Sequence, residues 1–321
     1  MIQPYDYYET NDSIAVTLSD VKRNIELIQE FAARHEYRVF WRGQMNHEWG
    51  LISSLVRRLA AASAVDDALL DRVEWALLTE AAAWITDLDQ DSYAYSLAKL
   101  AYLQHHGVPS RLLDFTADPW MAVFFAAESM DDLDGRIFAL LVRPDDILET
   151  TPKGRPWRKY KTNEVKVYDP ETAGLSFARV AAQKGVLVVG RLPSTQPHRT
   201  AIDRLLKTER SLLADEVRRI LSIPFKLSKF DPNLGQGGVP AGARSPIGLT
   251  FRLHVDKRSV RRDLAGVTAG KRISPPGASV MHRSVYPDAA GMVEHSEIIR
   301  GLDRGVLVMK SAKPRGRKRE L

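Results

Sequence analysis

The chain has 321 residues, of which 44% are hydrophobic, and it contains no cysteine. This length and apolar content are sufficient for one large hydrophobic core or two smaller ones, and the missing cysteines exclude disulfides, thiolate metal sites and a cysteine nucleophile. The first residues do not join a basic stretch to an apolar run, and no stretch approaches the length of a membrane span. We therefore expect a cytoplasmic globular protein with no membrane contact.

The net charge of +6 is concentrated at the C-terminal end. The last twelve residues carry six Lys or Arg and one Glu, a charge of +5, which leaves +1 for the other 309 residues. Such a run is typical of a solvated, disordered tail, expected here from about Ser311 onward. Its alternative role is weak, salt-dependent contact with nucleic acid, and it does not identify a target.

Apolar spacing and capping signals predict four helices in the first 130 residues, namely 20–35, 64–85, 92–106 and 120–128. We expect Asp20 to cap the first, Gly107 to end the third, and Asp118 followed by Pro119 to begin the fourth. In the second helix the apolar residues form a stripe with Asp and Glu on the opposite side. That stripe predicts a face buried in the core.

Strands and a loop separate these helices. A strand at 37–41 is followed by Arg42, so this arginine is expected where the strand leaves the core, and 136–142 predicts a buried strand. Segment 110–116 mixes polar and apolar residues and is too short for a helix, so we expect a loop that carries Asp114.

The second half of the chain gives weaker signals of the same kind. Its expected elements are a short helix or turn at 177–184, a strand at 185–192, a helix at 211–221 paired with one begun near Ala201, a strand at 249–255, a helix at 256–264, a strand at 280–285 and a helix from Pro287 to about Arg300.

This mixture of elements predicts an α/β fold of the α+β type, with a mixed sheet packed by several helices in a single large domain with insertions. We expect an N-terminal segment at 1–19, the domain at 20–300 and a C-terminal segment at 301–321. Within the domain, 231–248 contains five glycines and three prolines, which predicts a flexible surface loop.

Two motifs give the chain a resemblance to a known family. They are Phe-Trp-Arg-Gly-Gln at 40–44 and Leu-Gln-His-His-Gly-Val-Pro-Ser-Arg-Leu-Leu-Asp-Phe-Thr at 103–116, the second followed by Trp120, Ala122, Phe125 and Ala126. Both resemble the defining motifs of the FRG-domain family of cytosolic bacterial and phage-associated proteins. Three later pieces, at 179–185, 251–264 and 285–291, are similar to further family elements in the same order. The resemblance therefore covers roughly residues 20 to 300.

The resemblance implies a phage-defence or toxin-type effector but no established common reaction. Ser110 stands where the family often has threonine, and the stretches 200–221 and 231–248 look like insertions. The chemistry has to be inferred from the residues themselves.

Arginines are the first candidates for a ligand site. Arg42 beside Gly43 offers a fork of five donors to a phosphate or carboxylate while the glycine lets a ligand approach the backbone. The alternative is a buried salt bridge between Arg42 and Asp114. Arg111 and Arg179 come from other motifs, and the three arginines would form an anion cradle if they converge.

The remaining polar candidates each have two interpretations. Asp114 is either the orienting partner of Arg42 or Arg111, the interpretation we favour, or a general base. His105 and His106 lie about 100° apart on a helix, so they cannot share one metal; one of them lines a cleft or simply ends the helix. Glutamines at 44, 104 and 183 suit recognition of a base or nicotinamide edge, or satisfy buried backbone groups.

Standard catalytic signatures are missing. The segment 266–271 is one residue shorter than a phosphate-binding loop, and His47-Glu48 has no second histidine four residues on, so neither a P-loop nor a zinc protease site is predicted, and no metal site is expected.

Two functions from different classes follow. The first is an enzyme that binds a nucleotide or dinucleotide, in the manner of ADP-ribosyltransferase-like toxins, with Arg42, Asp114 and a late glutamate, Glu297 or Glu294, as catalytic candidates. The second is a non-catalytic module that senses a nucleotide, nucleic acid or phage protein and signals to a protein partner. The ligand-binding candidates are Arg42, Gly43, Gln44, His106, Arg111, Arg179 and Gln183. We expect Arg42, Arg111, Asp114 and Gln183 to face one cleft.

Overall fold

The computed structural model describes residues 7–8, 12–60, 64–84, 95–174, 177–193, 200–203, 208–211, 214–224, 226–234, 238–239, 246–265 and 285–286. The expectations for 266–284 and 287–321 lie outside these residues. They include most of the strand at 280–285, the last helix with Glu294 and Glu297, and the basic tail.

A sheet of nine described strands forms the centre of the fold, in the order β1-β11-β4-β2-β3-β7-β6-β5, with β10 beside β11. The strands of this sheet are β1 (Ser13–Ala15), β2 (Arg38–Gln44), β3 (Leu113–Thr116), β4 (Gly135–Val142), β5 (Ile147–Leu148), β6 (Val165–Tyr168), β7 (Gly185–Gly190), β10 (Lys226–Leu227) and β11 (Ile247–Leu253). The outer pairs β1–β11, β10–β11 and β5–β6 are parallel and the others antiparallel. The mixed sheet confirms the predicted fold class, an α/β fold in a single domain.

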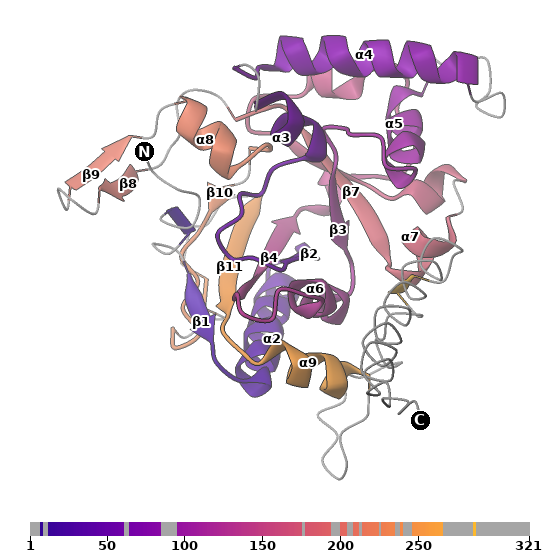
Figure 1. The fold of residues 1–321 in the computed structure, drawn as a ribbon. Coiled ribbons are helices and arrows are strands. Elements are labelled where there is room, and N and C mark those ends of the chain that lie inside the picture. Colours follow the sequence, from indigo (N-terminus) through magenta and orange to yellow (C-terminus); the bar gives the residue numbers. More distant parts are fainter. Residues whose placement is uncertain are drawn as a thin grey trace, which may run out of the picture.

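Helices lie on both sides of this sheet (Figure 1). The described α-helices are α2 (Leu18–Arg34), α3 (Ser54–Ala60), α4 (Asp67–Trp84), α5 (Ser96–His105), α6 (Pro119–Ala127), α7 (Ala178–Ala182), α8 (Ala214–Ile220) and α9 (Lys257–Leu264). Short 3-10 turns occupy η1 (Pro144–Asp146), η2 (Pro156–Lys159) and η3 (Pro170–Ala173).

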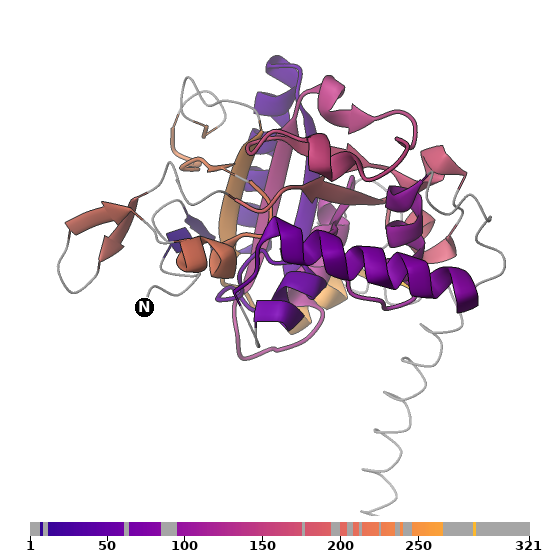
Figure 2. The same cartoon turned by 90° about the horizontal axis from the view of Figure 1, so that it is seen from above.

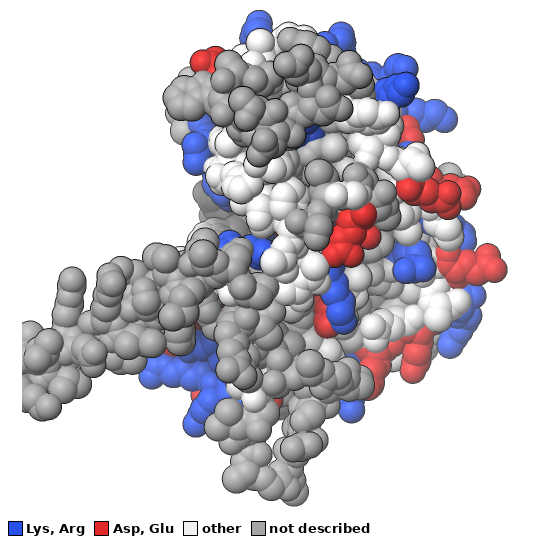
Figure 3. Space-filling model, turned by 90° about the vertical axis from the view of Figure 1, so that its right-hand side faces the viewer, with Lys and Arg blue, Asp and Glu red and all other residues white. Residues whose placement is uncertain are grey.

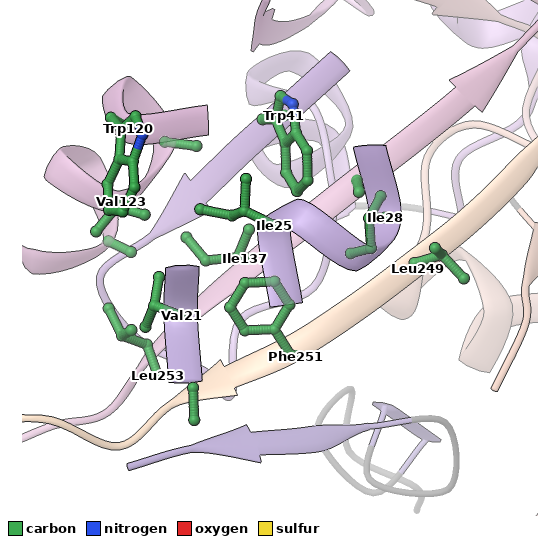
Figure 4. Close-up of a cluster of buried hydrophobic side chains, with 14 of the residues drawn as sticks. Val21, Ile25, Ile28, Trp41, Trp120, Val123, Ile137, Leu249, Phe251 and Leu253 are labelled. Carbon is green, nitrogen blue, oxygen red and sulfur yellow. The ribbon is translucent and has the colours of Figure 1, made fainter. Parts of the chain in front are cut away.

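One face of β11, β4 and β2 is covered by α2, α6 and α9. The side chains that fill this layer point toward one another in Figure 4: Val21, Ile25 and Ile28 from α2, Trp41 from β2, Trp120 and Val123 from α6, Ile137 from β4, and Leu249, Phe251 and Leu253 from β11. All ten are buried, as the apolar spacing of α2 predicts.

The opposite face of the sheet carries a second cluster, in which Phe40 and Phe138 pack against Tyr8 and against Ile220 at the end of α8. A third cluster joins α4 and α5 to the β6 and β7 end of the sheet. In Figures 1 and 2 the long helix α4 runs along the outside of the molecule. The helix α6 therefore packs on the part of the sheet formed by β2, β4 and β11, and α5 packs on the part formed by β6 and β7. The strand β3 lies between these two parts.

Several local predictions are confirmed. Asp118 is the N-cap of α6, accepting the Trp120 amide at 3.0 Å, with Pro119 in the first turn. Gly107 follows the end of α5 with φ of 84°, the left-handed conformation that glycine adopts without strain.

Other local predictions are wrong. Thr17, not Asp20, caps α2: Asp20 lies three residues inside and completes a reciprocal capping box with Thr17. The strand at 37–41 continues to Gln44, so Arg42 lies within β2 because full pairing with β4 extends the strand. The segment near Ala201 is not a helix but a hairpin of β8 (Thr200–Asp203) and β9 (Thr208–Ser211).

The expected loop at 110–116 is wrong in part, because its second half is the strand β3. Leu113 and Phe115 are buried and Asp114 is exposed, the alternation that a strand gives to its two faces. Pairing with β7 along four residues stabilises this short strand. Within 231–248, the structure describes 231–234, 238–239 and 246–248. The Val239 side chain is buried against Phe230 in the first core, and the last two residues of the expected loop already belong to β11.

Candidate functional site

A cavity of about 460 Å³ lies between α5, α6 and α7, above the strands β2, β3 and β7. Its charged lining consists of Arg42, Arg57, Arg179, Asp114 and Glu128. Its aromatic lining consists of Trp41, Trp49, His105, Phe115, Phe125, Phe177 and Tyr286, and its amide lining of Gln44, Gln104 and Gln183. Segments that are far apart in the sequence therefore supply one concave, mixed polar and aromatic surface, the form that small-molecule sites take.

The cavity lies where the sheet opens between β2 and β3. These strands share one register pair, Trp41 with Thr116, whereas β2 and β4 share seven. Beyond Trp41 the gap is bridged by the side chain of Arg42, whose Nη1 donates to the backbone carbonyl of Asp114 at 2.6 Å. The arginine thus replaces a strand-to-strand hydrogen bond at the point where the ladder ends.

Arg42 retains unused donors in this position. Its Nε is buried and has no hydrogen-bond partner among the described residues, and no described carboxylate lies within ion-pair distance of the guanidinium. Burial lowers the pKa of Arg42, the charge of Arg57 lowers it further, and the charge of Asp114 opposes this effect. The expected salt bridge between Arg42 and Asp114 is therefore wrong, because the guanidinium contacts only the backbone carbonyl of Asp114. A buried cation without a counter-ion costs free energy.

The carboxylate of Asp114 is held by an amide instead of an arginine. Gln104 Nε2 donates to Asp114 Oδ1 at 2.6 Å, and the hydroxyl of Ser110 donates to Gln104 Oε1. Ser110 Oγ in turn accepts the amide of Leu112 at 3.0 Å. This series of hydrogen bonds fixes the orientation of the Gln104 amide, because the amide oxygen faces a donor and the amide nitrogen faces an acceptor.

Arg111 lies away from this cavity, in contrast to the expected common cleft. Its side chain is 3% exposed, with Nε donating to Glu74 Oε2 at 2.7 Å, and its backbone amide donates to Glu74 Oε1 at 3.0 Å. Its Nη1 lies 3.4 Å from Asp67, and its guanidinium stacks over Trp157. Of the four residues expected to converge, Arg42, Asp114 and Gln183 line the cavity and Arg111 does not.

Glu74 is the partner of Arg111 that the sequence did not reveal. The prediction that the acidic residues of the second helix face outward is wrong for Glu74, which is fully buried on α4. Burial raises the pKa of Glu74, and Arg111 opposes that rise through its charge and two hydrogen bonds. The spacing signal was present, since Leu70, Glu74 and Leu78 lie on one helical face.

Val285 and Tyr286 contact the wall of the cavity that α7 forms. Gln183 Nε2 donates to the backbone carbonyl of Val285 at 3.2 Å, and the guanidinium of Arg179 lies 4.9 Å from the ring centre of Tyr286. The Tyr286 hydroxyl donates to Glu128 on the opposite wall at 2.7 Å. Residues 285 and 286 thereby connect the two sides of the cavity.

The two histidines have different positions. His105 lines the cavity and stacks on Phe177, with ring centres 4.3 Å apart at 23°. His106, the one proposed from the sequence as a ligand contact, packs against Tyr102 and is not part of the lining. His105 is therefore the histidine that the structure offers to a ligand.

Gly43 lines the cavity, and it is also required by packing. A Cβ built on Gly43 would lie 1.8 Å from the backbone oxygen of Ala122 and 2.7 Å from the amide nitrogen of Ala126. The helix α6 therefore rests directly on β2 at this glycine. Close helix-to-strand packing therefore explains this glycine independently of any ligand, and the predicted ligand approach at Gly43 stays a prediction.

Arg57 on α3 is a lining residue that the sequence analysis missed. Its side chain is exposed, and the described part of the chain offers it no ion pair. Gln44, in contrast, was a candidate: it is buried, donates to the Gly50 carbonyl at 3.2 Å, and leaves its amide oxygen without a partner among the described residues. The late glutamates Glu294 and Glu297 lie outside the described residues.

Charge elsewhere on the described surface is mixed. Figure 3 shows basic and acidic side chains interspersed over the described part of one face, as expected if most of the net charge belongs to the C-terminal segment. Within the residues that the structure describes, no cluster of three or more His, Asp or Glu could hold a metal ion. None of the helices described has the length and apolar character needed to cross a membrane.

The fold and its site define an α/β domain with an arginine- and aromatic-lined cavity at an opening in a mixed sheet. Residues 37–135 match the family model of the FRG domain, so this chain carries an FRG domain, as the two motifs predicted. The matched range runs from β2 to the start of β4 and includes Arg42, Gln104, Arg111 and Asp114. No curated protein and no solved structure matches the chain.

Proposed function

We propose that this FRG-domain protein binds a phosphorylated ligand of the nucleotide or dinucleotide class in its cavity, as a phage-defence or toxin-type effector. The observation that carries the binding proposal is the buried Nε of Arg42, which has no hydrogen-bond partner among the described residues while it lines the cavity. An unsatisfied buried donor on a cation costs free energy that an anionic ligand recovers. The effector role rests on the family resemblance alone.

The surroundings of Arg42 support an anion of this class. Arg57 adds a second positive charge without a described ion pair, and the planar fork of an arginine matches two phosphate oxygens at once. Phe125 and the stacked pair of His105 and Phe177 supply flat surfaces for a base. A volume of about 460 Å³ lies within the range of roughly 300 to 1,000 Å³ that is usual for small-molecule sites.

Binding is tested by calorimetric titration of the full chain with ATP, GTP, NAD and inorganic tripolyphosphate. Loss of charge-assisted hydrogen bonds predicts that Arg42→Ala weakens phosphate-dependent binding at least about tenfold, and that Arg42→Lys restores little because it lacks the fork. Arg38→Ala is the matched control, since Arg38 is exposed on the same strand. Wild-type affinity in Arg42→Ala, or no binding of any of these ligands, contradicts the proposal.

Catalysis is a separate question that the same ligands answer. An enzyme of the ADP-ribosyltransferase-like class would break the bond between nicotinamide and ribose as the ribose carbon bonds to water or to an acceptor nucleophile, and mass spectrometry after incubation detects the free nicotinamide that leaves. Asp114 supports this alternative as a carboxylate beside Arg42 in the cavity. Tight binding with the ligand recovered intact would instead favour the non-catalytic sensing module.

A further inference from the structure

Asp114 and Arg42 are adjacent opposite charges that do not pair with each other. Arg42 Nη1 contacts the backbone carbonyl of Asp114 at 2.6 Å, yet the carboxylate of the same residue receives its hydrogen bond from Gln104. A carboxylate beside an arginine normally forms a bidentate ion pair with it. Here the amide of Gln104, which also lines the cavity, donates to the carboxylate in place of the guanidinium.

The series of hydrogen bonds that holds Asp114 runs from the partly buried Gln104 to the fully buried Ser110, and each of its groups has a defined orientation. Ser110 has no exposed surface; its hydroxyl donates to Gln104 Oε1 and accepts the amide of Leu112, while its backbone amide donates to Ser54 Oγ at 3.2 Å. Because Gln104 has its oxygen occupied by Ser110, only its nitrogen can face Asp114. Such a chain fixes the position of the carboxylate without neutralising its charge.

The carboxylate keeps unused acceptor capacity toward the cavity. An ionised carboxylate has about four lone-pair sites and no donor, and Gln104 occupies one of them. The Asp114 side chain is exposed and lines the cavity beside the guanidinium of Arg42. A ligand group at Asp114 must therefore be a hydrogen-bond donor, because a phosphate oxygen would be repelled.

We propose that Asp114 accepts hydrogen bonds from the ribose hydroxyls of the ligand, that Gln104 and Ser110 are its positioning residues, and that the cavity therefore selects ribonucleotides. This inference rests on the proposed binding of a nucleotide at Arg42. A nucleotide places hydroxyl donors within a few bonds of its phosphate, which matches the neighbouring cation and carboxylate. A site built to bond a hydroxyl strongly disfavours the analogue that lacks it, since its own acceptor is then left unpaired.

The test compares each ribonucleoside triphosphate with its 2′,3′-dideoxy analogue and with inorganic tripolyphosphate, which has no ribose. The wild-type chain should bind one or more ribonucleotides at least about tenfold more tightly than the analogue. In Asp114→Asn, which keeps the shape but replaces the charged acceptor by a weaker neutral one, the ratio should fall, while tripolyphosphate affinity should be retained or rise because the repelling carboxylate is gone. Asp145→Asn is the control, because Asp145 is exposed and away from the cavity.

Gln104→Met tests the positioning role, since it removes the amide and preserves most of the volume. Its ratio of ribonucleotide to dideoxynucleotide affinity should fall while tripolyphosphate affinity stays near wild type, and the melting temperature should fall only modestly, because the buried Ser110 hydroxyl loses its acceptor. Equal wild-type affinity for ribo- and dideoxynucleotides, or tripolyphosphate binding without any nucleotide binding, overturns the ribose proposal and leaves the phosphate site intact. Failure of every ligand, tripolyphosphate included, instead overturns the proposed function on which it rests.

Discussion

Glu74 and Arg111 lie 37 positions apart in the sequence and form a buried ion pair that joins α4 to the start of β3. The carboxylate accepts from both the side chain and the backbone amide of Arg111, at 2.7 and 3.0 Å. The strand β3 begins at Leu113, two residues after Arg111. A family-motif arginine thereby belongs to the scaffold of the site, and it sets the position of the strand that carries Asp114.

We predict that Glu74→Ala destabilises the chain by about 3 kcal/mol, because the buried Arg111 then loses its close carboxylate partner and keeps only the longer contact to Asp67 at 3.4 Å. Chemical denaturation measures this change in the free energy of unfolding. Glu80→Ala, an exposed position on the same helix, should change it by less than about 0.5 kcal/mol.

The double variant Glu74→Met/Arg111→Met separates the pair from its surroundings. Replacing both charges by apolar side chains of similar volume should recover most of the loss, since no buried charge then lacks a partner. A double variant as unstable as the sum of the single ones would mean that the two residues stabilise the fold independently.

Local signals made part of this fold predictable. Asp118 followed by Pro119 fixes the beginning of α6, and Gly107 the end of α5, because both act within a single turn of helix. The family motifs placed Arg42 and Asp114 near one another, and the structure brings both to the cavity.

The features that could not be predicted from the sequence depend on contacts between distant segments. Glu74 appeared to be an ordinary exposed acidic residue because its partner lies on another element, and β3 appeared to be a loop because its pairing with β7 stabilises a strand of four residues. The close contact of Gly43 with Ala122 likewise exists only once α6 packs on β2. Spacing along one chain does not reveal such contacts, because each arises from tertiary packing.

Gly43→Ala should be among the most destabilising small substitutions in the chain. The new methyl group would lie 1.8 Å from the backbone oxygen of Ala122, so β2 and α6 must separate. Overpacking of this kind costs about 3 kcal/mol or more when backbone atoms have to move. Thermal unfolding followed by circular dichroism measures the loss.

Gly107→Ala provides the comparison for Gly43. Gly107 has φ of 84° and nothing within 4 Å of an added Cβ, so the substitution meets backbone strain without a clash. We expect a cost of roughly 1 to 2 kcal/mol. Equal losses at the two glycines would argue against close packing as the role of Gly43.

The N-terminal segment should respond to pH through Asp12. Its carboxylate lies 2.8 Å from Arg136 in the interior, and burial raises the pKa of Asp12 from 3.8 to about 6 against the opposing charge of Arg136. Between pH 4 and pH 6 the folded chain then binds more protons at Asp12 than the unfolded chain does. The free energy of unfolding should therefore rise as the pH falls from 6 to 4, by at most about 3 kcal/mol.

Asp12→Asn isolates this contribution, because an amide does not titrate. Denaturation of wild type and variant in parallel between pH 4 and pH 7 gives the difference in slope that belongs to Asp12. A wild-type chain that loses stability relative to Asp12→Asn on acidification would show that the charged carboxylate is the favoured form, and the sign of the prediction would be wrong.

Arg42 should contribute more to binding than to stability. Its guanidinium makes one described hydrogen bond, to a backbone carbonyl, and burial lowers its pKa, so the folded chain gains little from the charge. We predict that Arg42→Ala changes the free energy of unfolding by less than about 1.5 kcal/mol, whereas breaking a buried ion pair costs about 3 to 5 kcal/mol. The double variant Arg42→Ala/Asp114→Ala should equal the sum of its single variants, because Asp114 is held by Gln104 and not by Arg42. If Arg42→Ala melts far below wild type and the double variant regains most of the lost melting temperature, the two residues form a structural ion pair. The charge of Arg42 is then already paired within the protein, and the ligand proposal for Arg42 is contradicted.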